Sequence, residues 1–324
     1  MQRPPADADW MAAAIALSRR GRPASAPNPN VGCLLVKDGT VVGRGWTQPG
    51  GRPHAEAMAL AAAGDAARGA TAYVTLEPCA HASPRGPACS DSLITADVAR
   101  VVIAAQDPDQ RTDGLGIARL RDAGIEVVFN MAPAAARAAM APWWTRQSEG
   151  RPFVTLKLAT SLDGCIARAD GASRWITGPR ARAHGHLERA QHQAILVGRG
   201  TFDADAPGLD VRLPGLEDRS PRKMLLTRGT APAGWTAVAA PEAVGDVDSL
   251  LVEGGARTAA AFLAADRVDR LLLYRAPILI GGGKAALGDI GLTDLADAHG
   301  RWRPVDSRLL GSDRLDVYER IRTI

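Results

Sequence analysis

Three residues with side chains that bind zinc lie within one stretch of the chain. His54 and Glu56 form a His-Ala-Glu triplet, and two cysteines follow at Cys79 and Cys89. One imidazole and two thiolates supply three ligands and leave the fourth tetrahedral position open for water, as in catalytic zinc sites. A carboxylate that is not a ligand, here Glu56, is what such a water needs in order to lose and pass on protons. The stretch therefore predicts a catalytic site with one zinc ion per chain.

This arrangement matches the zinc deaminase signature in its first half only. The signature joins H-x-E to P-C-x-x-C, whereas nine residues separate Cys79 from Cys89 here. A single buried cysteine is usually a small apolar side chain in a core, which is our expectation for Cys33 and Cys165. The spacing leaves His81 open between a substrate contact and a surface position.

Elements of an α/β fold are expected around this stretch. A hairpin is predicted over 31–37 and 40–45 because Asp38-Gly39 separates the two runs. Pro78 before Cys79 suits a turn from a strand into a helix, whose N-terminus would stabilise a thiolate. Helices are expected over 9–20, 54–63, 91–96 and 115–123, strands over 71–76, 100–105 and 125–129, and a helical connector over 130–150. Together they predict an α/β sandwich with a largely parallel sheet.

Two asparagines precede the hairpin, in Pro27-Asn28-Pro29-Asn30. Asparagine favours turns for local reasons. This turn, however, leads into the buried strand before the predicted zinc helix, so Asn28 and Asn30 are equally candidates for ligand-binding amides. The residues alone leave both interpretations open.

The second half of the chain has an α/β pattern of its own. Leu315, Val317 and Ile321 alternate with polar residues, which predicts a half-exposed edge strand near the C-terminus. Other strands are expected over 153–159, 194–197, 223–227, 249–252 and 270–274, and helices over 179–191 and 257–265. At 324 residues the chain is long enough for two domains, which we place at 1–148 and 149–324.

Glycine clusters follow several predicted strands of the second half. They lie at 198–201 (GRGT), 253–255 (EGG) and 281–284 (GGGK). Glycine lets backbone amides approach a phosphate closely, although such clusters are also common in plain turns. Because all three are expected at the carboxyl ends of strands, we predict a ligand crevice there. None is a complete G-x-G-x-x-G, so a standard Rossmann domain is disfavoured.

The composition excludes several classes of protein. Hydrophobic residues make up 46% and charged residues 23%, as in soluble globular proteins. The chain has no run of about eighteen apolar residues and no signal peptide, so we expect a cytoplasmic protein without membrane contact. The four cysteines also favour a reducing compartment. A net charge of +4 without a basic block argues against nucleic acid, and a few arginines that bind small phosphorylated ligands would account for the basic excess equally well.

With these residues in view, the whole chain resembles the bifunctional deaminase/reductase family of riboflavin biosynthesis. Residues 27–32 (PNPNVG), 54–56 (HAE) and 77–81 (EPCAH) are similar to its deaminase half, and 157–164 (KLATSLDG), 173–177 (SRWIT) and 252–255 (VEGG) to its reductase half. The resemblance implies a cytidine-deaminase-like α/β/α sandwich followed by a dihydrofolate-reductase-like α/β domain. It also implies zinc, NADPH and small phosphorylated pyrimidine substrates, and we expect a homo-oligomer, a dimer or a tetramer.

The implied reaction has two steps. The first is the hydrolytic deamination of 2,5-diamino-6-(5-phosphoribosylamino)pyrimidin-4-one. The second is the NADPH-dependent reduction of the ribosyl group of 5-amino-6-(5-phosphoribosylamino)uracil to a ribityl chain. The alternatives are a nucleic-acid base deaminase with an accessory domain and a non-catalytic regulator on the same scaffold.

The resemblance also assigns residues one by one. In the first half, His54, Cys79 and Cys89 are the zinc ligands, Glu56 is the proton shuttle, and Asn28 and His81 are substrate contacts. In the second half, the substrate contacts are Ser173, Arg189, Leu209, Arg212 and Glu253, and the NADPH contacts are Ala159, Trp175, Thr201, Asp205, Thr227 and Gly255. Arg189 and Arg212 also have a physical argument, since guanidinium suits bidentate phosphate recognition. Ala159 and Leu209 are equally explained by packing, and Asp163 is expected to shape the turn before Gly164.

The chain departs from the family pattern at three places. The segment 81–89 (HASPRGPAC) is one residue longer than usual, and Arg85 is the candidate to bind the phosphoribosyl end. Thr47 stands where a histidine is common, and Ala206 where the reductase often has a second aspartate. Because the zinc ligands are all present, we expect altered contacts in an active site.

Overall fold

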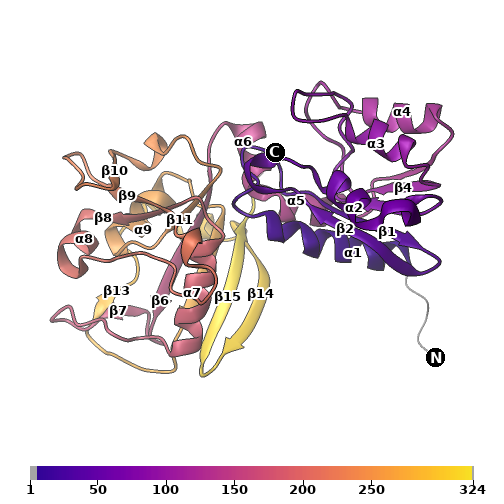
Figure 1. Ribbon diagram of the computed structural model, residues 1–324. Helices are drawn as coiled ribbons and strands as arrows, with labels where there is room; N and C mark the ends of the chain where they lie inside the picture. Colours follow the sequence, from indigo (N-terminus) through magenta and orange to yellow (C-terminus); the bar gives the residue numbers. More distant parts are fainter. Residues whose placement is uncertain (1–5, 323–324) are drawn as a thin grey trace. The chain divides into compact units, whose positions relative to one another are not determined.

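The computed structural model describes residues 6–322, which divide into two compact units between Ser148 and Glu149. Figure 1 colours the first unit from indigo to magenta and the second from pink to yellow. Each unit has a main β-sheet of its own, one five-stranded and the other eight-stranded. Within residues 6–322, every helix falls short of the length and apolar character that a membrane crossing requires.

The sheet of the first unit is mixed. Its strands are β1 (Gly32–Lys37), β2 (Thr40–Trp46), β3 (Thr71–Val74), β4 (Arg100–Ile103) and β5 (Glu126–Phe129), in the order β2-β1-β3-β4-β5. Only β3, β4 and β5 are parallel, because β1 runs antiparallel to both of its neighbours. The expectation of a largely parallel sheet was therefore wrong for this unit: the hairpin at Asp38-Gly39 forces β1 and β2 to be antiparallel.

Helices cover both faces of this sheet (Figure 1). Their bounds are α1 (Asp7–Ser18) and α5 (Pro133–Ala139) on one face, α2 (Ala55–Ala63), α3 (Cys89–Thr95) and α4 (Leu115–Asp122) on the other, and α6 (Ala141–Glu149) at the end of the unit. Short 3-10 helices span Arg19–Gly21, Pro49–Gly51 and Gly64–Ala67. A β-carbon on Gly32 would meet the backbone of α1, and one on Gly45 the backbone of α2, at 2.2 Å from the carbonyl oxygens of Ala14 and Ala55. The unit is thus an α/β/α sandwich in which α1 and α2 pack closely against glycines of the sheet.

The sheet of the second unit is parallel over most of its width. Its strands are β6 (Phe153–Thr160), β8 (Ala194–Gly198), β9 (Arg222–Leu226), β10 (Trp235–Val238), β11 (Ser249–Val252), β12 (Arg270–Arg275), β14 (Trp302–Leu310) and β15 (Asp313–Arg320). The order is β10-β9-β8-β11-β6-β12-β15-β14, and the antiparallel pairs are β12–β15 and β15–β14. Two short strands, β7 (Cys165–Ala167) and β13 (Lys284–Ala285), pair separately.

The expected C-terminal edge strand is not at the edge. β15 lies between β12 and β14, and its residues Leu315 and Val317 are buried. The edge is β14, which no pattern in the sequence predicted. Its side chains are almost all exposed, so it carries no alternation of apolar and polar residues that could have identified it.

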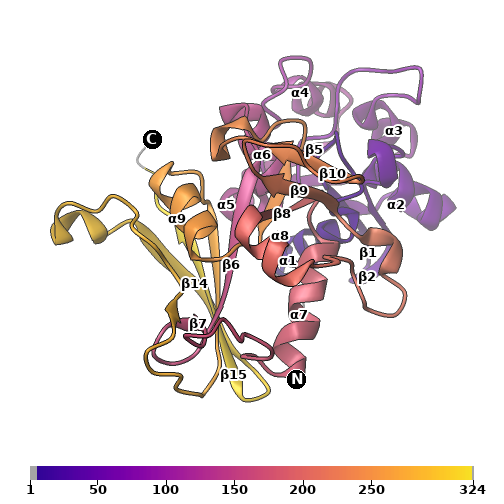
Figure 2. The same ribbon diagram turned by 90° about the vertical axis from the view of Figure 1, so that its left-hand side faces the viewer.

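Helices pack on both faces of the second sheet as well (Figure 2). The bounds are α7 (Pro179–Ala190), α8 (Arg199–Asp205) and α9 (Ala256–Ala264), with 3-10 turns at Glu217–Arg219, Pro241–Ala243 and Leu295–Ala298. Phe262 of α9 joins a core with Leu156 and Leu158 of β6, whereas Ala181 of α7 packs with Leu272 and Tyr274 of β12. Residues 194–198 and 249–252 are buried throughout, as expected for central parallel strands.

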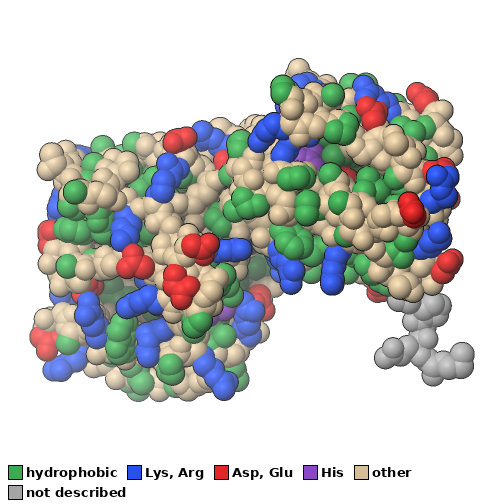
Figure 3. Space-filling view, viewed as in Figure 1, with side chains coloured by type: hydrophobic (Ala, Val, Ile, Leu, Met, Phe, Trp, Pro, Cys, Tyr) green, Lys and Arg blue, Asp and Glu red, His purple; other side chains and the backbone are tan. Residues whose placement is uncertain are grey.

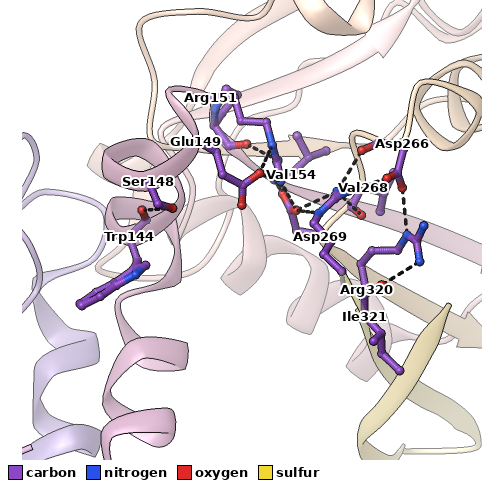
Figure 4. A network of polar contacts seen from close by, with 12 residues as sticks. Trp144, Ser148, Glu149, Arg151, Val154, Asp266, Val268, Asp269, Arg320 and Ile321 are labelled. Atoms are coloured by element: carbon purple, nitrogen blue, oxygen red, sulfur yellow. Dashed lines mark hydrogen bonds and ion pairs between the residues drawn. The ribbon is translucent and has the colours of Figure 1, made fainter. Parts of the chain in front are cut away.

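The charged side chains of the surface are mixed in sign. On the face drawn in Figure 3, Lys and Arg are interspersed with acidic and apolar side chains. Many of them are paired within the described chain, and one network holds the C-terminal end of β15 (Figure 4). In this network Asp269 accepts hydrogen bonds from Arg151 and from the backbone N–H of Val154, and Asp266 accepts one from Arg320. The network joins the first strand of the second unit to its last.

A glycine-to-alanine substitution tests the close packing of α2 on β2. The added methyl group of Gly45→Ala would lie 2.2 Å from Ala55 O and 2.6 Å from Ala59 N, both backbone atoms that cannot turn away. We expect the free energy of unfolding, measured with denaturant, to fall by about 1–3 kcal/mol. Arg44→Ala, on the exposed side of the same strand, is the control and should unfold like the wild type. Equal stability of the two variants would contradict the packing.

Candidate functional site

The three predicted zinc ligands come together in the first unit. His54 directly precedes α2, Cys89 is the first residue of α3, and Cys79 lies in the loop after β3. His54 Nδ1 is 3.3 Å from Cys89 Sγ and 3.6 Å from Cys79 Sγ, and the three ligand atoms lie within 4.8 Å of one another. Both cysteines are buried. One nitrogen and two sulfurs converging at this distance fit a zinc ion with an open fourth position.

The helix that supports the thiolates begins at the second cysteine. The backbone N–H of Cys89 donates a hydrogen bond of 3.3 Å to Cys79 Sγ. Hydrogen bonds from the side chains of Cys89 and His54 lower the pKa of Cys79 to about 4, against the effect of burial. The expectation that the turn at Pro78-Cys79 leads into a helix was therefore wrong: residues 77–88 form a loop, and the helix N-terminus reaches Cys79 from Cys89.

Glu56 lies beside this cluster in the first turn of α2. Its side chain is 3% exposed, and this burial raises the pKa of the carboxyl group to about 7. A group that is half protonated near neutral pH can both accept and donate a proton during a reaction. Glu56 thus has the proton affinity that the role of proton shuttle requires.

A cavity of about 870 Å³ opens onto Glu56 and the metal cluster. Asn28 and His81 both line it. Asn28 Nδ2 lies 3.1 Å from His54 Nε2 and donates to Gly51 O, and His81 Nδ1 lies 3.5 Å from Thr112 Oγ1. Asn30, by contrast, is buried and donates to the carbonyl groups of Ser18 and Ala139, so it has a structural role.

The altered positions of the first half also lie on this cavity. Thr47 is buried in its wall, where its hydroxyl group accepts a hydrogen bond from Val31 N. Arg85, in the longer loop, reaches across it and donates to Gly50 O. Arg85 therefore supplies a cation at the mouth of the cavity.

Other residues of the cavity were not predicted. Asp107 follows β4, and burial raises the pKa of its carboxyl group to about 6. Arg111 and Trp144 also line the wall. The position of Asp107 after a buried parallel strand was a usable signal. Trp144 belongs to the connector helix α6, and nothing local in its sequence indicates that it faces the cavity.

The second unit contains a larger cavity, of about 1230 Å³. It is lined by the carboxyl ends of five neighbouring strands, β9, β8, β11, β6 and β12, together with α7 and the short β7–β13 pair. Residues predicted to contact substrate or NADPH that line it are Ala159, Ser173, Trp175, Arg189, Thr201, Asp205, Arg212, Glu253 and Gly255. The structure thus brings most of the predicted reductase residues into one cavity.

Glu253 is the most strongly constrained charge in this cavity. Arg189 donates to both of its oxygens, at 2.8 and 3.0 Å, and Lys157 Nζ lies 3.5 Å away. Burial acts to raise the pKa of Glu253, but the charge of Lys157 and the hydrogen bonds from Arg189 outweigh it and lower the pKa to about 2. Because Arg189 is occupied by this carboxylate, the exposed Arg212 is the better placed of the two arginines to bind a phosphate group.

The structure places several predicted residues away from the cavity wall. Leu209 is buried in a core with Ile195 and Leu251, which agrees with the packing interpretation. Thr227, at the end of β9, is not among the lining residues, although its hydroxyl oxygen lies 3.5 Å from Arg199 of the cavity wall. Ala206 is an exposed residue at the end of α8.

The glycines of the third cluster, 281–283, do not line the cavity, although Lys284 at the end of that cluster does. Residues 281–283 lie in the loop between β12 and β13, well after the end of a strand. There the carboxylate of Asp163 accepts hydrogen bonds from the backbone N–H groups of Ile280 and Gly281 and from Ser161 Oγ. Asp163 therefore holds two loops together, in agreement with its expected role in the turn before Gly164.

Lys157, Arg182 and Tyr274 line the second cavity and were not predicted. Lys157 had a usable signal, because it is the one charged residue of the apolar strand β6. Tyr274 is 1% exposed, and its hydroxyl group lies 2.7 Å from His184 Nδ1. In sequence it resembles an ordinary core residue of β12.

Family models match both units. Residues 4–105 match the cytidine and deoxycytidylate deaminase zinc-binding region. Residues 152–235 and 242–315 match the RibD C-terminal domain. The first match covers the metal cluster and Glu56, and the second covers most of the larger cavity.

Whole-chain comparisons point to the same proteins. The chain is 40% identical to the riboflavin biosynthesis protein RibD of Escherichia coli, over 90% of this chain and 94% of that protein. It is 38% identical to RibD of Mycobacterium tuberculosis, over 94% and 95%. Among solved structures it is similar to Acinetobacter baumannii RibD, with a TM-score of 0.84 and 34% identity over 98% and 99% of the two chains.

A further similar structure is the diaminohydroxyphosphoribosylaminopyrimidine deaminase/5-amino-6-(5-phosphoribosylamino)uracil reductase of Thermotoga maritima. Its TM-score is 0.86, with 30% identity over 97% of this chain and 99% of that one. These likenesses confirm the two-domain fold and extend over nearly all of the chain. The chain therefore belongs to the RibD family of riboflavin biosynthesis proteins.

Proposed function

We propose that this protein is a bifunctional enzyme of riboflavin biosynthesis that first deaminates a phosphoribosylated diaminopyrimidinone and then reduces its ribosyl group. The observation that carries the proposal is the presence of two separate, chemically different cavities in one chain. One contains a His-Cys-Cys cluster beside the buried Glu56. The other is lined by several arginines, by glycine turns and by Glu253, which is paired with Arg189. We assign deamination to residues 1–148 and reduction to residues 149–324.

In the first unit, His54, Cys79 and Cys89 would hold one zinc ion, which when bound supplies an activated water for attack on the amidine carbon of the pyrimidine. Glu56 takes up a proton at its carboxylate as the water attacks and returns it to the departing amine, so that ammonia leaves. Its pKa near 7 makes both transfers accessible. Asn28 and His81 orient the ring from the cavity wall, and Arg85 binds the phosphate end.

In the second unit, bound NADPH supplies the hydride that reduces C1 of the ribosyl group. The protein has to hold the two molecules against each other. Gly255 precedes α9, so its backbone and the N-terminus of that helix can receive the phosphates of the cofactor. Thr201 Oγ1 accepts a hydrogen bond of 3.1 Å from Gly255 N and fixes this turn. Arg212 binds the phosphate of the substrate, and Ser173 and Glu253 contact its sugar and ring.

Some properties of the whole protein are part of the same proposal. All four cysteines lie within the described residues and form no disulfide, which suits a reducing cytoplasm. The edge strand β14 exposes Val305 and Leu309, and an exposed edge of this kind offers unpaired backbone groups to a strand of another chain. This supports a homo-oligomer, a dimer or a tetramer. The rival function, deamination of nucleic-acid bases, is disfavoured because the second unit matches a reductase-type domain of the RibD family and its surface mixes both signs of charge.

Chelation of zinc should separate the two activities. After dialysis against a strong chelator, we expect ammonia release from the diaminopyrimidinone to stop, because the fourth-position water is lost. NADPH oxidation should continue at the untreated rate when the deaminated intermediate is supplied. Ammonia and NADPH absorbance would be followed in the same samples. Ammonia release that survives complete loss of zinc would overturn the deaminase assignment, and no NADPH oxidation with either substrate would overturn the reductase assignment.

The substitution Glu56→Gln should leave zinc in place and remove proton transfer. We expect ammonia release to slow by about 10²–10⁴-fold, the usual contribution of a general acid–base. Zinc content by atomic emission should stay at the wild-type ratio, because the carboxylate is not one of the three ligands. Asp65→Asn, an exposed acid in the same unit, is the control. A Glu56→Gln enzyme with normal turnover would remove Glu56 from the mechanism.

The substitution Arg212→Ala should affect the reductase alone. Loss of a charge-assisted contact of about 1.5–3 kcal/mol predicts a KM for the deaminated intermediate raised by at least about tenfold. The rate of ammonia release should not change, since Arg212 lies in the second unit. Arg219→Ala removes an exposed arginine from the same loop, outside the cavity wall, and serves as the control. If both variants have the wild-type KM, Arg212 does not bind the substrate.

A further inference from the structure

We propose that Arg199 binds the 2′-phosphate of NADPH and is the residue that makes the second unit prefer NADPH to NADH. This inference rests on the proposed reductase function and goes beyond it by naming the source of cofactor selectivity. Arg199 is the first residue of α8, directly after β8, and it lines the larger cavity. None of the other assignments made above uses its guanidinium group.

The order of the strands determines which end of the cofactor comes near Arg199. Lys157 and Tyr274 lie near the ends of β6 and β12, and of the residues assigned to the substrate Glu253 follows β11 and Arg189 lies on α7. Ser173 follows β7, and Arg212, in the loop after α8, is held next to α7 by a hydrogen bond from its backbone N–H to His186 Nδ1. The nicotinamide ring has to lie there in order to reach the sugar. Gly255 and the start of α9, which suit the pyrophosphate, come next to β8. The remaining part of the cavity, at the ends of β8 and β9, is therefore left for the adenosine end, and this is where Arg199 and Leu226 lie.

Contacts hold the guanidinium group of Arg199 at this place. Its Nη2 donates a hydrogen bond of 2.6 Å to Thr230 O and lies 3.5 Å from Thr227 Oγ1, both in the turn after β9. Thr227 in turn accepts a hydrogen bond from Gly229 N, which stabilises that turn. Two strand ends thus fix one edge of the group. An arginine at the adenosine ribose is a general means by which dinucleotide sites accommodate a 2′-phosphate.

The remaining donors of Arg199 are suited to an anion. Arginine has five N–H groups, and among the hydrogen bonds of residues 6–322 Arg199 uses Nη2 alone. Its Nη1 lies 3.7 Å from the carboxylate of Asp203, a weak and largely exposed pair. Nε and Nη1 are therefore open to a phosphate without loss of a buried contact.

Acidic groups near this end determine which of the two cofactors is favoured when Arg199 is removed. Asp205 lies on the same short helix and lines the cavity. A carboxylate next to the adenosine ribose favours the free hydroxyl group of NADH and repels a phosphate. With Arg199 removed, Asp203 loses the cation that lies 3.7 Å from it, and among the described residues Asp205 keeps only a pair of 3.9 Å with Arg174. The cofactor preference should then shift towards NADH.

The test compares Arg199→Ala with a variant that removes the same charge elsewhere. Arg222→Ala is the matched control, because Arg222 is exposed at the start of β9, at the opposite end of the strand from the cavity. Binding of NADPH and NADH would be titrated by protein fluorescence on the full chain. We expect the wild type and Arg222→Ala to bind NADPH at least about tenfold more tightly than NADH, and Arg199→Ala to lose this difference. Unchanged NADH binding by Arg199→Ala would show that its fold is intact.

A second titration isolates the phosphate. Adenosine 2′,5′-bisphosphate should bind the wild type more tightly than adenosine 5′-phosphate, and Arg199→Ala should bind both alike. Arg199→Lys, which keeps the charge without the planar fork, should retain part of the preference.

The proposal is overturned if Arg199→Ala still prefers NADPH, or if it weakens both dinucleotides equally. A wild type that binds NADPH and NADH with equal affinity would overturn it as well, but would leave the proposed function standing. A wild type that binds neither dinucleotide would overturn the reductase function and this inference together.

Discussion

Both cavities depend on places where two backbone segments approach so closely that a β-carbon does not fit. In the first unit, α2 lies against Gly45, and this contact sets the position from which His54 and Glu56 reach the metal cluster. In the second unit, a β-carbon on Gly254 would lie 2.4 Å from Thr258 Cβ of α9. The turn that we assign to the cofactor phosphates and the first turn of α9 are therefore packed closely together. These glycines thus help to determine the positions of the chemically active side chains.

Each cavity contains one buried glutamate, and their surroundings give the two carboxyl groups opposite properties. For Glu56 the effect of burial outweighs the opposing effects of His54 and of the hydrogen bond from Cys89, so its pKa rises to about 7 and it can exchange a proton at neutral pH. Glu253 meets Lys157 and Arg189, so its pKa falls to about 2 and it stays ionised. The first arrangement suits acid–base catalysis and the second suits fixed electrostatic recognition. This difference agrees with a hydrolytic step in one unit and a hydride transfer, for which the cofactor supplies the chemistry, in the other.

The sequence predicted the elements of both units better than their pairing. Central strands such as β8 and β11 are short apolar runs that the sequence predicts directly. The predicted zinc ligands, whose residue types have few other uses together, lie close to one another in the structure. β14 was not predicted because its side chains are exposed on both faces. Strand pairing depends on contacts between distant segments, which no local pattern contains. The loop from Glu77 to Ala88 was mistaken for a turn into a helix, since Pro78 permits both. Residues such as Trp144 and Tyr274 became cavity residues only through the packing of distant segments.

A two-step reaction on one phosphorylated substrate would explain why both cavities contain arginines. If one phosphorylated molecule is deaminated in the first unit and reduced in the second, each cavity must bind the same phosphate group. Arg85 and Arg111 line the first cavity, and Arg182 and Arg212 the second. The cofactor brings a further phosphate to the second cavity, where we place Arg199. A chain with only +4 net charge can satisfy all of these needs because several of its cations line the cavities while other arginines pair with acids, as Arg151 does with Asp269. The small basic excess is thus better explained by two small-ligand sites than by a nucleic-acid surface.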